Sequence, residues 1–350
     1  MKKVSKQNRL EPVRNQIITE PRQLDFFALF DVDREEYSQT VKLWGMIPVH
    51  VFGKVEREAG KYLPSFERDF VYDKTSYSIK VTPARIEAAD GSDRDAYMGL
   101  REQLVEMAIL KLAADGRAKV VHMGGLFTVF FTRKSLQDEL KIQGHTYSYP
   151  QIEEAIKIMF KSSVELRRDG VNGGDSFHPI EAYGFRGQNE EEFTYVKFSP
   201  QVTAAIENGD YRLINYKQLM SYSLTLSRML HKKMVHSFVY ADTEEKTFHF
   251  LANSVYRDFG LNQDSLLKHK VAEIKKALEE LIQGKVILSY ITEKKADPTK
   301  KSRSIDMKFI ITPHKNFVDA VFKANASEKR RKGQIAIEKN LPPEIRGMLK

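Results

Sequence analysis

The sequence of 350 residues contains no cysteine. This absence excludes disulfides, cysteine nucleophiles and thiolate-bound zinc or iron–sulfur sites, and it fits a reducing compartment. No apolar run approaches the roughly 20 residues that a membrane-spanning helix needs. The basic start continues into Gln7, Asn8 and Arg9 instead of a signal-peptide core. We therefore expect a soluble, cytoplasmic protein that does not enter a membrane.

Motifs for catalysis are also missing. The sequence has no His-x-His, the metal-binding pattern of enzymes that nick DNA with a tyrosine, and no Gly-x-x-x-x-Gly-Lys-Ser/Thr for nucleotide hydrolysis. Asp31-Val-Asp33 and Asp93-Arg-Asp95 have the spacing of the acidic pairs in primases and nucleases. A cap or a solvated helix start explains each pair better, so we expect no enzyme, no metal and no cofactor.

Positive charge is in excess. The 56 lysines and arginines outnumber the 47 acidic residues, which gives a formal net charge of +9. Cations laid on phosphates release condensed counterions, so this balance favours a polyanionic partner, although charge alone is weak evidence. The excess concentrates in the first 22 residues, in 293–304 and in Lys329–Lys332, where the last run could be a DNA arm or a solubilising tail.

One order of elements occurs twice in the sequence. In the first copy, apolar spacing predicts a helix over 93–115, a strand over 127–132, a helix from Thr132 to Ile142 and a third helix from Tyr149. Ser148 and Gln151 form a capping box before that third helix. Val164–Arg168 and Phe193–Phe198 are predicted as a strand pair. Helix, strand, two helices and a strand pair are typical of a winged helix-turn-helix.

The second copy repeats this order with different residues. It consists of a helix over 223–238, a short strand over 248–250, a helix over 251–259, a turn over 260–264 and a helix from Ser265. Strands over 286–291 and 305–311 then enclose a lysine-rich tip. A basic hairpin beside a basic helix is what a wing needs to reach phosphates.

The predicted fold class is α+β, with two tandem winged helix-turn-helix domains over 93–204 and 205–324. A small β-rich module over 23–92 precedes them, with strand-like stretches at 43–52 and 77–81. Residues 1–22 are predicted to be a flexible basic N-terminus, and 325–350 a basic flexible C-terminal tail. Trp44, the single tryptophan, is predicted to lie in the core.

The second copy supplies most of the predicted DNA contacts. Its helix start and helix face contribute Gln263, Ser265, Lys268, His269, Lys275 and Lys276, and its hairpin contributes Lys294, Lys295, Lys300, Lys301 and Arg303. Residues at the helix start are expected nearest to base edges, and the lysines on phosphates. The alternatives are a solvated lysine-rich helix face and an ordinary soluble hairpin.

The first copy offers a second, weaker surface. Its candidates are His145, Thr146, Tyr147, Ser148, Gln151, Lys157, Lys161, Arg167 and Arg168. Turn chemistry and packing explain 145–148 equally well. Glu153, Glu154 and Glu165 dilute the charge of this surface, so we expect the second copy to bind DNA more strongly and the first to provide the protein interface.

Several segments resemble plasmid replication initiators of the theta-replicating, iteron-binding kind. They are Tyr97–Ala113, Phe131–Leu140, Gly144–Tyr149, Val196–Val202 and Ser227–His231. The resemblance covers most of residues 25–325 and implies paired winged-helix domains. It also implies binding to repeated double-stranded sequences (iterons) at a plasmid origin, opening of an AT-rich segment and recruitment of the host initiator DnaA and the replicative helicase. A homodimer that represses its own promoter, and a bacterial, plasmid- or nucleoid-associated location, follow from the same resemblance.

The predicted function is therefore that of a plasmid replication initiator. A winged-helix transcriptional regulator is the alternative within DNA-binding proteins. A metal-dependent primase or nuclease using one of the acidic pairs is the less favoured alternative from another class.

Overall fold

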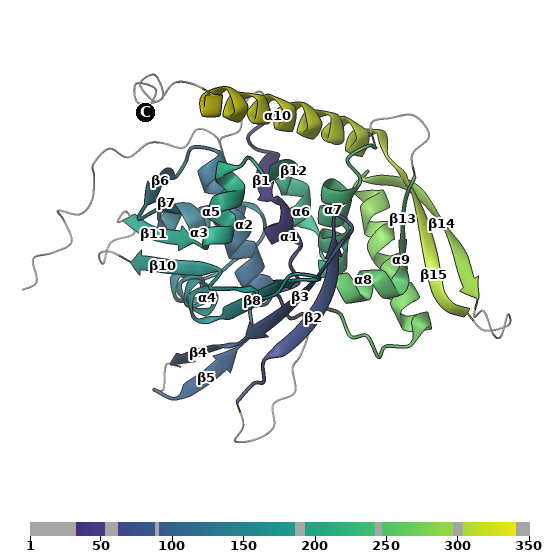
Figure 1. Cartoon of the computed structure of the whole chain (residues 1–350), viewed down its shortest axis with the longest axis horizontal. Coiled ribbons are helices and arrows are strands. Elements are labelled where there is room, and N and C mark those ends of the chain that lie inside the picture. Colours follow the sequence, from purple (N-terminus) through teal and green to yellow (C-terminus); the bar gives the residue numbers. More distant parts are fainter. Residues whose placement is uncertain are drawn as a thin grey trace, which may run out of the picture.

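Figure 1 shows a computed structural model of the chain, which describes residues 33–52, 62–87, 91–185, 193–241, 247–296 and 304–340. The helices in these ranges are α1 (Lys42–Met46), α2 (Leu100–Ala114), α3 (Arg133–Ile142), α4 (Tyr149–Lys161), α5 (Pro200–Glu207), α6 (Tyr216–Ser221), α7 (Thr225–Ser237), α8 (Ala252–Asp258), α9 (Leu267–Gln283) and α10 (Lys315–Asn340). The strands are β1 (Tyr37–Val41), β2 (Phe66–Tyr72), β3 (Thr75–Thr82), β4 (Ala84–Glu87), β5 (Asp93–Ala96), β6 (Lys119–Met123), β7 (Leu126–Thr132), β8 (Ser163–Arg168), β9 (Asp175–Phe177), β10 (Ile180–Phe185), β11 (Phe193–Phe198), β12 (Tyr211–Asn215), β13 (Phe248–Leu251), β14 (Ile287–Ala296) and β15 (Ser304–Pro313). The fold is thus a mixed α and β structure with several small sheets.

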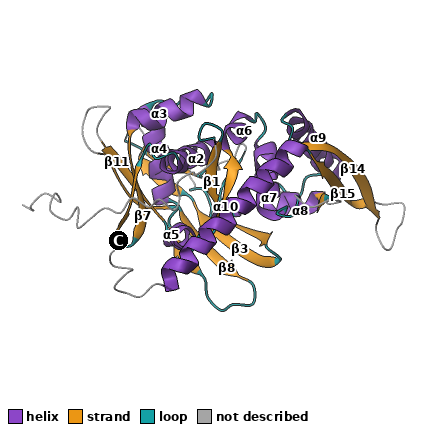
Figure 2. Cartoon of the chain, turned by 90° about the horizontal axis from the view of Figure 1, so that it is seen from above, coloured by secondary structure: helices purple, strands orange, loops and turns teal. Residues whose placement is uncertain are grey.

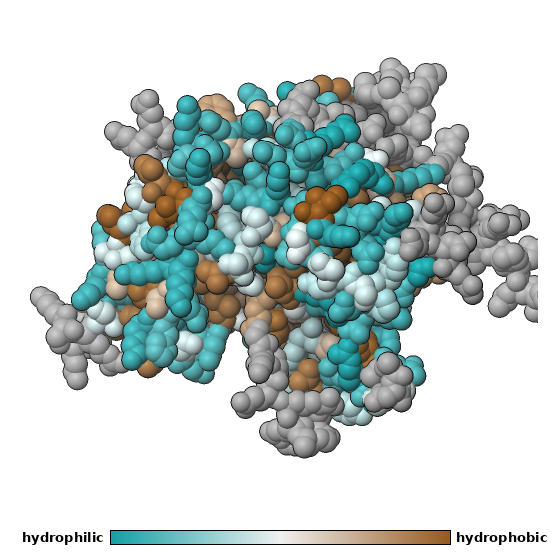
Figure 3. Space-filling model, turned by 180° about the vertical axis from the view of Figure 1, so that it is seen from behind, coloured by the Kyte–Doolittle hydropathy of each residue, from teal (hydrophilic) through white to brown (hydrophobic). Residues whose placement is uncertain are grey.

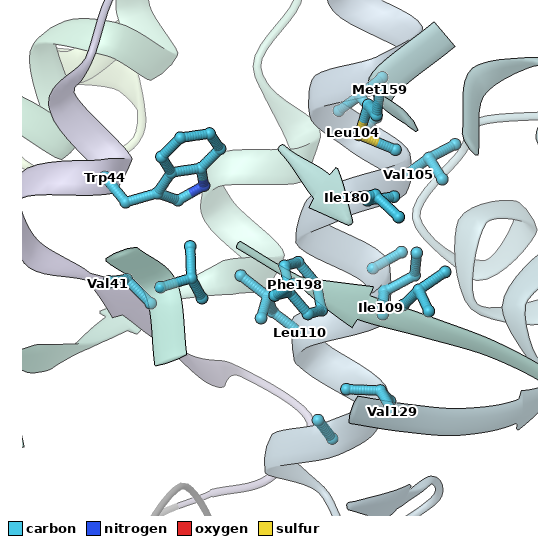
Figure 4. Close-up of a cluster of buried hydrophobic side chains, with 14 of the residues drawn as sticks. Val41, Trp44, Leu104, Val105, Ile109, Leu110, Val129, Met159, Ile180 and Phe198 are labelled. Atoms are coloured by element: carbon cyan, nitrogen blue, oxygen red, sulfur yellow. The ribbon is translucent and has the colours of Figure 1, made fainter. Parts of the chain in front are cut away.

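The first group of elements packs around α2. This helix is apolar on most of its surface, as expected for a helix enclosed on all sides, and Leu104, Val105 and Ile109 are fully buried. Figure 4 shows these residues among side chains from α4, β7 and β11. A four-stranded sheet in the order β10-β11-β7-β6 forms one wall of this core.

The second group packs α7, α8 and α9 against a three-stranded sheet in the order β13-β15-β14. β15 is antiparallel to both neighbours, with Phe309 opposite Phe250 on one side and Thr292 on the other. Ile274, Leu278 and Phe309 are fully buried in this core. Helix α8 also contacts β2, so the two groups lie side by side (Figure 1).

The strands of the predicted N-terminal module share their sheets with later parts of the chain. β1 pairs with β12, and β2 and β3 continue into β8 and β9 of the first copy. Residues 43–46, predicted as part of a strand, belong to the short helix α1 instead. Their side chains, including buried Trp44, join cores formed mainly by the later elements, so this segment has no separate core among the described residues.

The predicted strand pair of the first copy is wrong. β8 pairs with β3 and β9, whereas β11 pairs with β7 and β10 in another sheet. The hairpin that corresponds to β14–β15 is therefore β10–β11, because the chain between the two predicted strands contains two further strands. The predicted helix start at residue 93 is also wrong, since 93–96 form β5 and α2 begins at Leu100.

Helix α10 corrects the prediction of a flexible tail over 325–340, whereas 341–350 lie outside the described residues. The helix runs to Asn340 and places Phe317 and Val321 in the second core and Ala324 in the first. Arg331 is only 5% exposed, and its guanidinium donates hydrogen bonds to the carbonyls of Gly209 and Tyr211. A helix that buries side chains in both cores ties the two groups together, as its position along both in Figure 1 shows.

The predicted flexible residues 1–22 lie outside the described part. None of the described helices is long and apolar enough to cross a membrane.

Candidate nucleic-acid interface

Helices α8 and α9 are joined by a tight turn in which Gly260 has a φ of +64°. The amide of Leu261 donates to the carbonyl of Tyr256 and closes the end of α8 at 2.8 Å. Helix α9 starts at Leu267, two residues after the predicted start, and buries Leu278 against α7 and the sheet. The opposite side of α9 is exposed, so this helix has one side free for a partner.

The lysines on the exposed side of α9 are not neutralised within the described part of the chain. Lys268, Lys275 and Lys276 are exposed, and among the described residues no acidic side chain forms an ion pair with them. Exposed cations without acidic partners give this side of the helix a positive potential.

The acids of α9 instead contact the rest of the protein. Glu279 accepts a hydrogen bond from the hydroxyl of Tyr290 at 3.0 Å, and Glu273 accepts one from Tyr256. Glu280 accepts from the amide and the hydroxyl of Ser223 at 2.7 and 2.8 Å, and so anchors the segment just before α7. The acids of this helix therefore hydrogen-bond to other elements, whereas its exposed lysines have no acidic partner among the described residues.

The hairpin β14–β15 projects from the end of the molecule, as Figure 2 shows. Each strand has ten residues, and the pairing is antiparallel as predicted. Lys294 and Lys295 are exposed near its far end, where Lys308 lies 3.6 Å from Glu293. The other predicted hairpin contacts, Lys300, Lys301 and Arg303, lie outside the described residues.

The turn over 260–266 carries the residues predicted to approach base edges. Gln263 is exposed, and its side-chain amide donates to the carbonyl of Leu261 at 3.3 Å. Ser265 is half-buried, and His269 is exposed in the first turn of α9. The structure thus brings Gln263, Ser265, Lys268 and His269 together at one end of the helix.

The corresponding turn in the first copy faces partly inward. The ring of His145 hydrogen-bonds to the carbonyl of Met220 at 3.0 Å, and burial lowers the pKa of this imidazole. Tyr147 is half-buried against the first core. Packing, the alternative explanation for this turn, accounts for both residues, whereas Thr146 and Ser148 are exposed.

Helix α4 starts with the predicted capping box. The amide of Ser148 donates to the side-chain oxygen of Gln151 at 2.8 Å, and the Gln151 amide donates back to the Ser148 hydroxyl at 3.4 Å. Both side chains are exposed but are engaged with the helix start. Lys157 and Lys161 are exposed further along α4.

The acids of α4 are paired with arginines that sequence reasoning missed. Glu153 lies 2.9 Å from Arg133, and Glu154 lies 2.8 Å from Arg101 and 2.5 Å from Arg94. Burial acts to raise the pKa of Glu154, but hydrogen bonds from Arg101 and Arg94 lower it below the ordinary value. These arginines are 20 to 60 residues away in sequence, so no local pattern could reveal the pairing.

Residues of the two copies meet along one groove. Its lining includes Arg167 on β8 and Gln263 in the α8–α9 turn, together with Lys80 and Arg257, which were not predicted. Arg167 also lies 3.3 Å from Glu165, and Arg168 is exposed at the end of the same strand. Acidic residues share the lining, so the groove has mixed charge.

On the face seen in Figure 3, hydrophilic side chains predominate between scattered apolar patches.

Two aspartates of the acidic pairs, Asp93 and Asp95, form hydrogen bonds within the protein. Asp93 accepts from Arg85 at 2.9 Å, and Asp95 accepts from the amide of Leu63 at 2.8 Å. Both lie on β5, so the expected role at a helix start is wrong for them. Asp31 lies outside the described residues. Within the described ranges, no group of three or more histidine, aspartate or glutamate side chains is placed to hold a metal ion.

No protein-family model and no curated protein matches this sequence. The chain is similar to solved structures of RctB domains 2 and 3, with TM-scores of 0.45 and 0.42, identities of 11% and 9%, and coverage of 73% and 78% of this chain and 94% and 96% of the other. It is also similar to the Pi initiator protein in complex with iteron DNA, with a TM-score of 0.41, 13% identity and coverage of 67% of this chain and 98% of the other.

Proposed function

We propose that this chain is a replication initiator that binds repeated double-stranded sequences at an origin and has no catalytic role of its own. One observation carries the proposal: α9 presents Lys268, Lys275 and Lys276 to solvent while its acids contact the protein, and a lysine-bearing hairpin stands beside it. A helix with one cationic side next to a cationic hairpin fits the major groove and the flanking phosphates of duplex DNA.

In this proposal, α7, α8 and α9 with β13, β14 and β15 form a winged helix. The start of α9 enters the major groove, so Gln263 and Ser265 lie nearest to base edges and the lysines contact phosphates. The first copy forms a second winged helix with β10–β11 as its hairpin. It adds weaker contacts through Lys157, Lys161 and Arg168.

The sequence resemblance supports the finer parts of the proposal. These are recognition of iterons at a plasmid origin, opening of an AT-rich segment, and recruitment of a host initiator and the replicative helicase. A homodimer that represses its own promoter, and a cytoplasmic, nucleoid- or plasmid-associated location, belong to the same proposal.

Footprinting of the protein on the DNA that flanks its gene tests this function. We expect protection of several direct repeats with uniform spacing, and permanganate-reactive thymines in an adjacent AT-rich segment when host proteins are added. Protection of a single promoter operator without repeats would instead indicate a transcriptional regulator. No protection at any flanking sequence would contradict DNA recognition altogether.

Substitution of the residues at the start of α9 tests the docking geometry. Gln263→Ala or Ser265→Ala should alter the preference at one base of the repeat by about 1–3 kcal/mol, because a direct base contact is lost. Competition among duplexes that vary one position at a time measures this change. Uniform weakening at all positions would show that the two side chains do not read bases.

A further inference from the structure

A buried lysine connects the turn before α9 with the start of α8. Lys270 is 5% exposed, unlike Lys268, Lys275 and Lys276 of the same helix. Its ammonium group donates to the carbonyl of Gln263 at 2.7 Å and to the side-chain oxygen of Asn253 at 3.0 Å. The ammonium group also lies 5.2 Å from the centre of the Tyr256 ring. Lys270 therefore connects the turn, which contains Gln263, to helix α8.

Asn253 extends this connection to the base of the hairpin. Its side-chain amide donates to the carbonyl of Ile305 at 3.1 Å, and its backbone amide donates to the carboxylate of Asp306 at 3.1 Å. Asp306 is only 7% exposed and also accepts from the amide of Met307 at 2.8 Å. The turn, the start of α8 and the first residues of β15 are thus linked by one chain of hydrogen bonds.

Burial of the Lys270 ammonium group is an inefficient way to stabilise the fold. Burial of an ammonium group costs free energy unless strong partners compensate for lost hydration. Within the described residues, Lys270 has two neutral oxygens and an aromatic ring as partners, and no ion pair with a carboxylate. A methionine would fill the same volume without that cost. A role in geometry explains the lysine better than a role in stability does.

We propose that Lys270 and Asn253 are positioning residues that set the spacing between the base-reading turn and the hairpin, and so determine preference for the correct repeat. This inference rests on the proposed function, since the turn and the hairpin are the two parts that contact DNA in it. Neither side chain touches DNA. Loss of the link lets the turn and the hairpin move independently, which weakens binding where both must fit one sequence.

The test compares Lys270→Met with Lys276→Met, an exposed lysine of the same helix. Dissociation constants for the footprinted repeat and for a scrambled duplex are measured over a range of salt concentrations. Lys270→Met should lower the ratio of specific to nonspecific affinity by about tenfold and leave the salt slope unchanged, because a buried ammonium releases no counterion. Lys276→Met should weaken both duplexes alike and reduce the slope by about 0.9.

A measurement without DNA separates this inference from the proposed function. Lys270→Met and Asn253→Ala should each speed hydrogen exchange at the amides of Asn253 and Met307, while the melting temperature stays near that of the wild type for Lys270→Met. Unchanged exchange, or an unchanged affinity ratio in a wild type that prefers the repeat, overturns the positioning role alone. A wild type with no preference for the repeat overturns the proposed function, and the role in specificity with it.

Discussion

Helices α4 and α9 hold the same place in the two copies, but their charged side chains have different partners. On α4 the acids Glu153 and Glu154 form ion pairs with arginines from other elements, and on α9 the acids bind tyrosine hydroxyls and the segment just before α7. Both helices therefore leave lysines exposed. The difference teaches that the charge a helix offers to a partner depends on the tertiary partners of its acids as well as on its own composition.

The largest expected effect concerns the two cores. Leu278→Ala in the second core and Ile156→Ala in the first should each reduce the free energy of unfolding by about 2–5 kcal/mol, because both side chains are fully buried. Since α10 contributes to both cores, we expect one shared transition. Trp44 fluorescence reports on the first core, so Leu278→Ala should shift it as much as it shifts far-UV circular dichroism. An unmoved Trp44 transition would mean that the copies unfold separately.

The next effect compares the lysines of the two helices. Lys268→Ala with Lys275→Ala should weaken binding to all duplexes about tenfold or more and reduce the salt slope by about two, because two phosphate contacts are lost. Lys157→Ala with Lys161→Ala should weaken binding only about threefold. Fluorescence anisotropy at several salt concentrations measures both. Equal losses would remove the distinction between the copies, and an unchanged slope would exclude the α9 face as the phosphate contact.

A smaller effect concerns Glu328, where α10 meets β12 and α1. Burial acts to raise the pKa of this carboxyl, but hydrogen bonds from Lys42 and Lys332 lower it to about 2. A lowered pKa stabilises the folded state above the ordinary value near 4.5, and this contribution is lost as the pH falls toward 2. Glu328→Gln should cost about 1–2 kcal/mol at pH 7. Urea unfolding of both proteins should show the difference shrinking below pH 4.5; a constant difference would contradict this origin.

The smallest effect concerns the capping box of α4. Gln151→Ala should reduce the free energy of unfolding by about 0.5–1 kcal/mol, because one hydrogen bond at the helix start is lost. We expect no change in the preferred DNA sequence, since this side chain already serves the helix. Thermal unfolding and duplex competition give the two readouts. An altered base preference would show that the first copy also reads sequence.

Local patterns predicted much of the fold. The capping box at Ser148, the Thr132 cap and the pairing of β14 with β15 depend on residues close in sequence. Helices α3, α4 and α9 and strands β14 and β15 appear close to their expected positions. The pairing of β8 with β3 could not be predicted, because it joins segments about 90 residues apart. Strand propensity gives a strand but not its partner.

The candidate site shows the same limit. Exposure of Lys268, Lys275 and Lys276 follows from helical periodicity, so the sequence predicted it. The inward orientation of the His145 ring depends on its hydrogen bond to the carbonyl of Met220, 75 residues later in the chain. Lys270 was missed because one more lysine in a lysine-rich helix gives no signal of burial. Its role follows only from the structure, in which its ammonium group donates hydrogen bonds to oxygens of Gln263 and Asn253.

Gly260 lies where the two groups touch. Any side-chain carbon at this position would overlap the guanidinium group of Arg68, which donates hydrogen bonds to the carbonyls of Pro48 and His50 at 2.6 and 2.7 Å. The backbone there also has a positive φ, which glycine adopts most easily. Across natural relatives, we expect these two positions to evolve together: a larger residue at 260 should appear only where a shorter one has replaced Arg68.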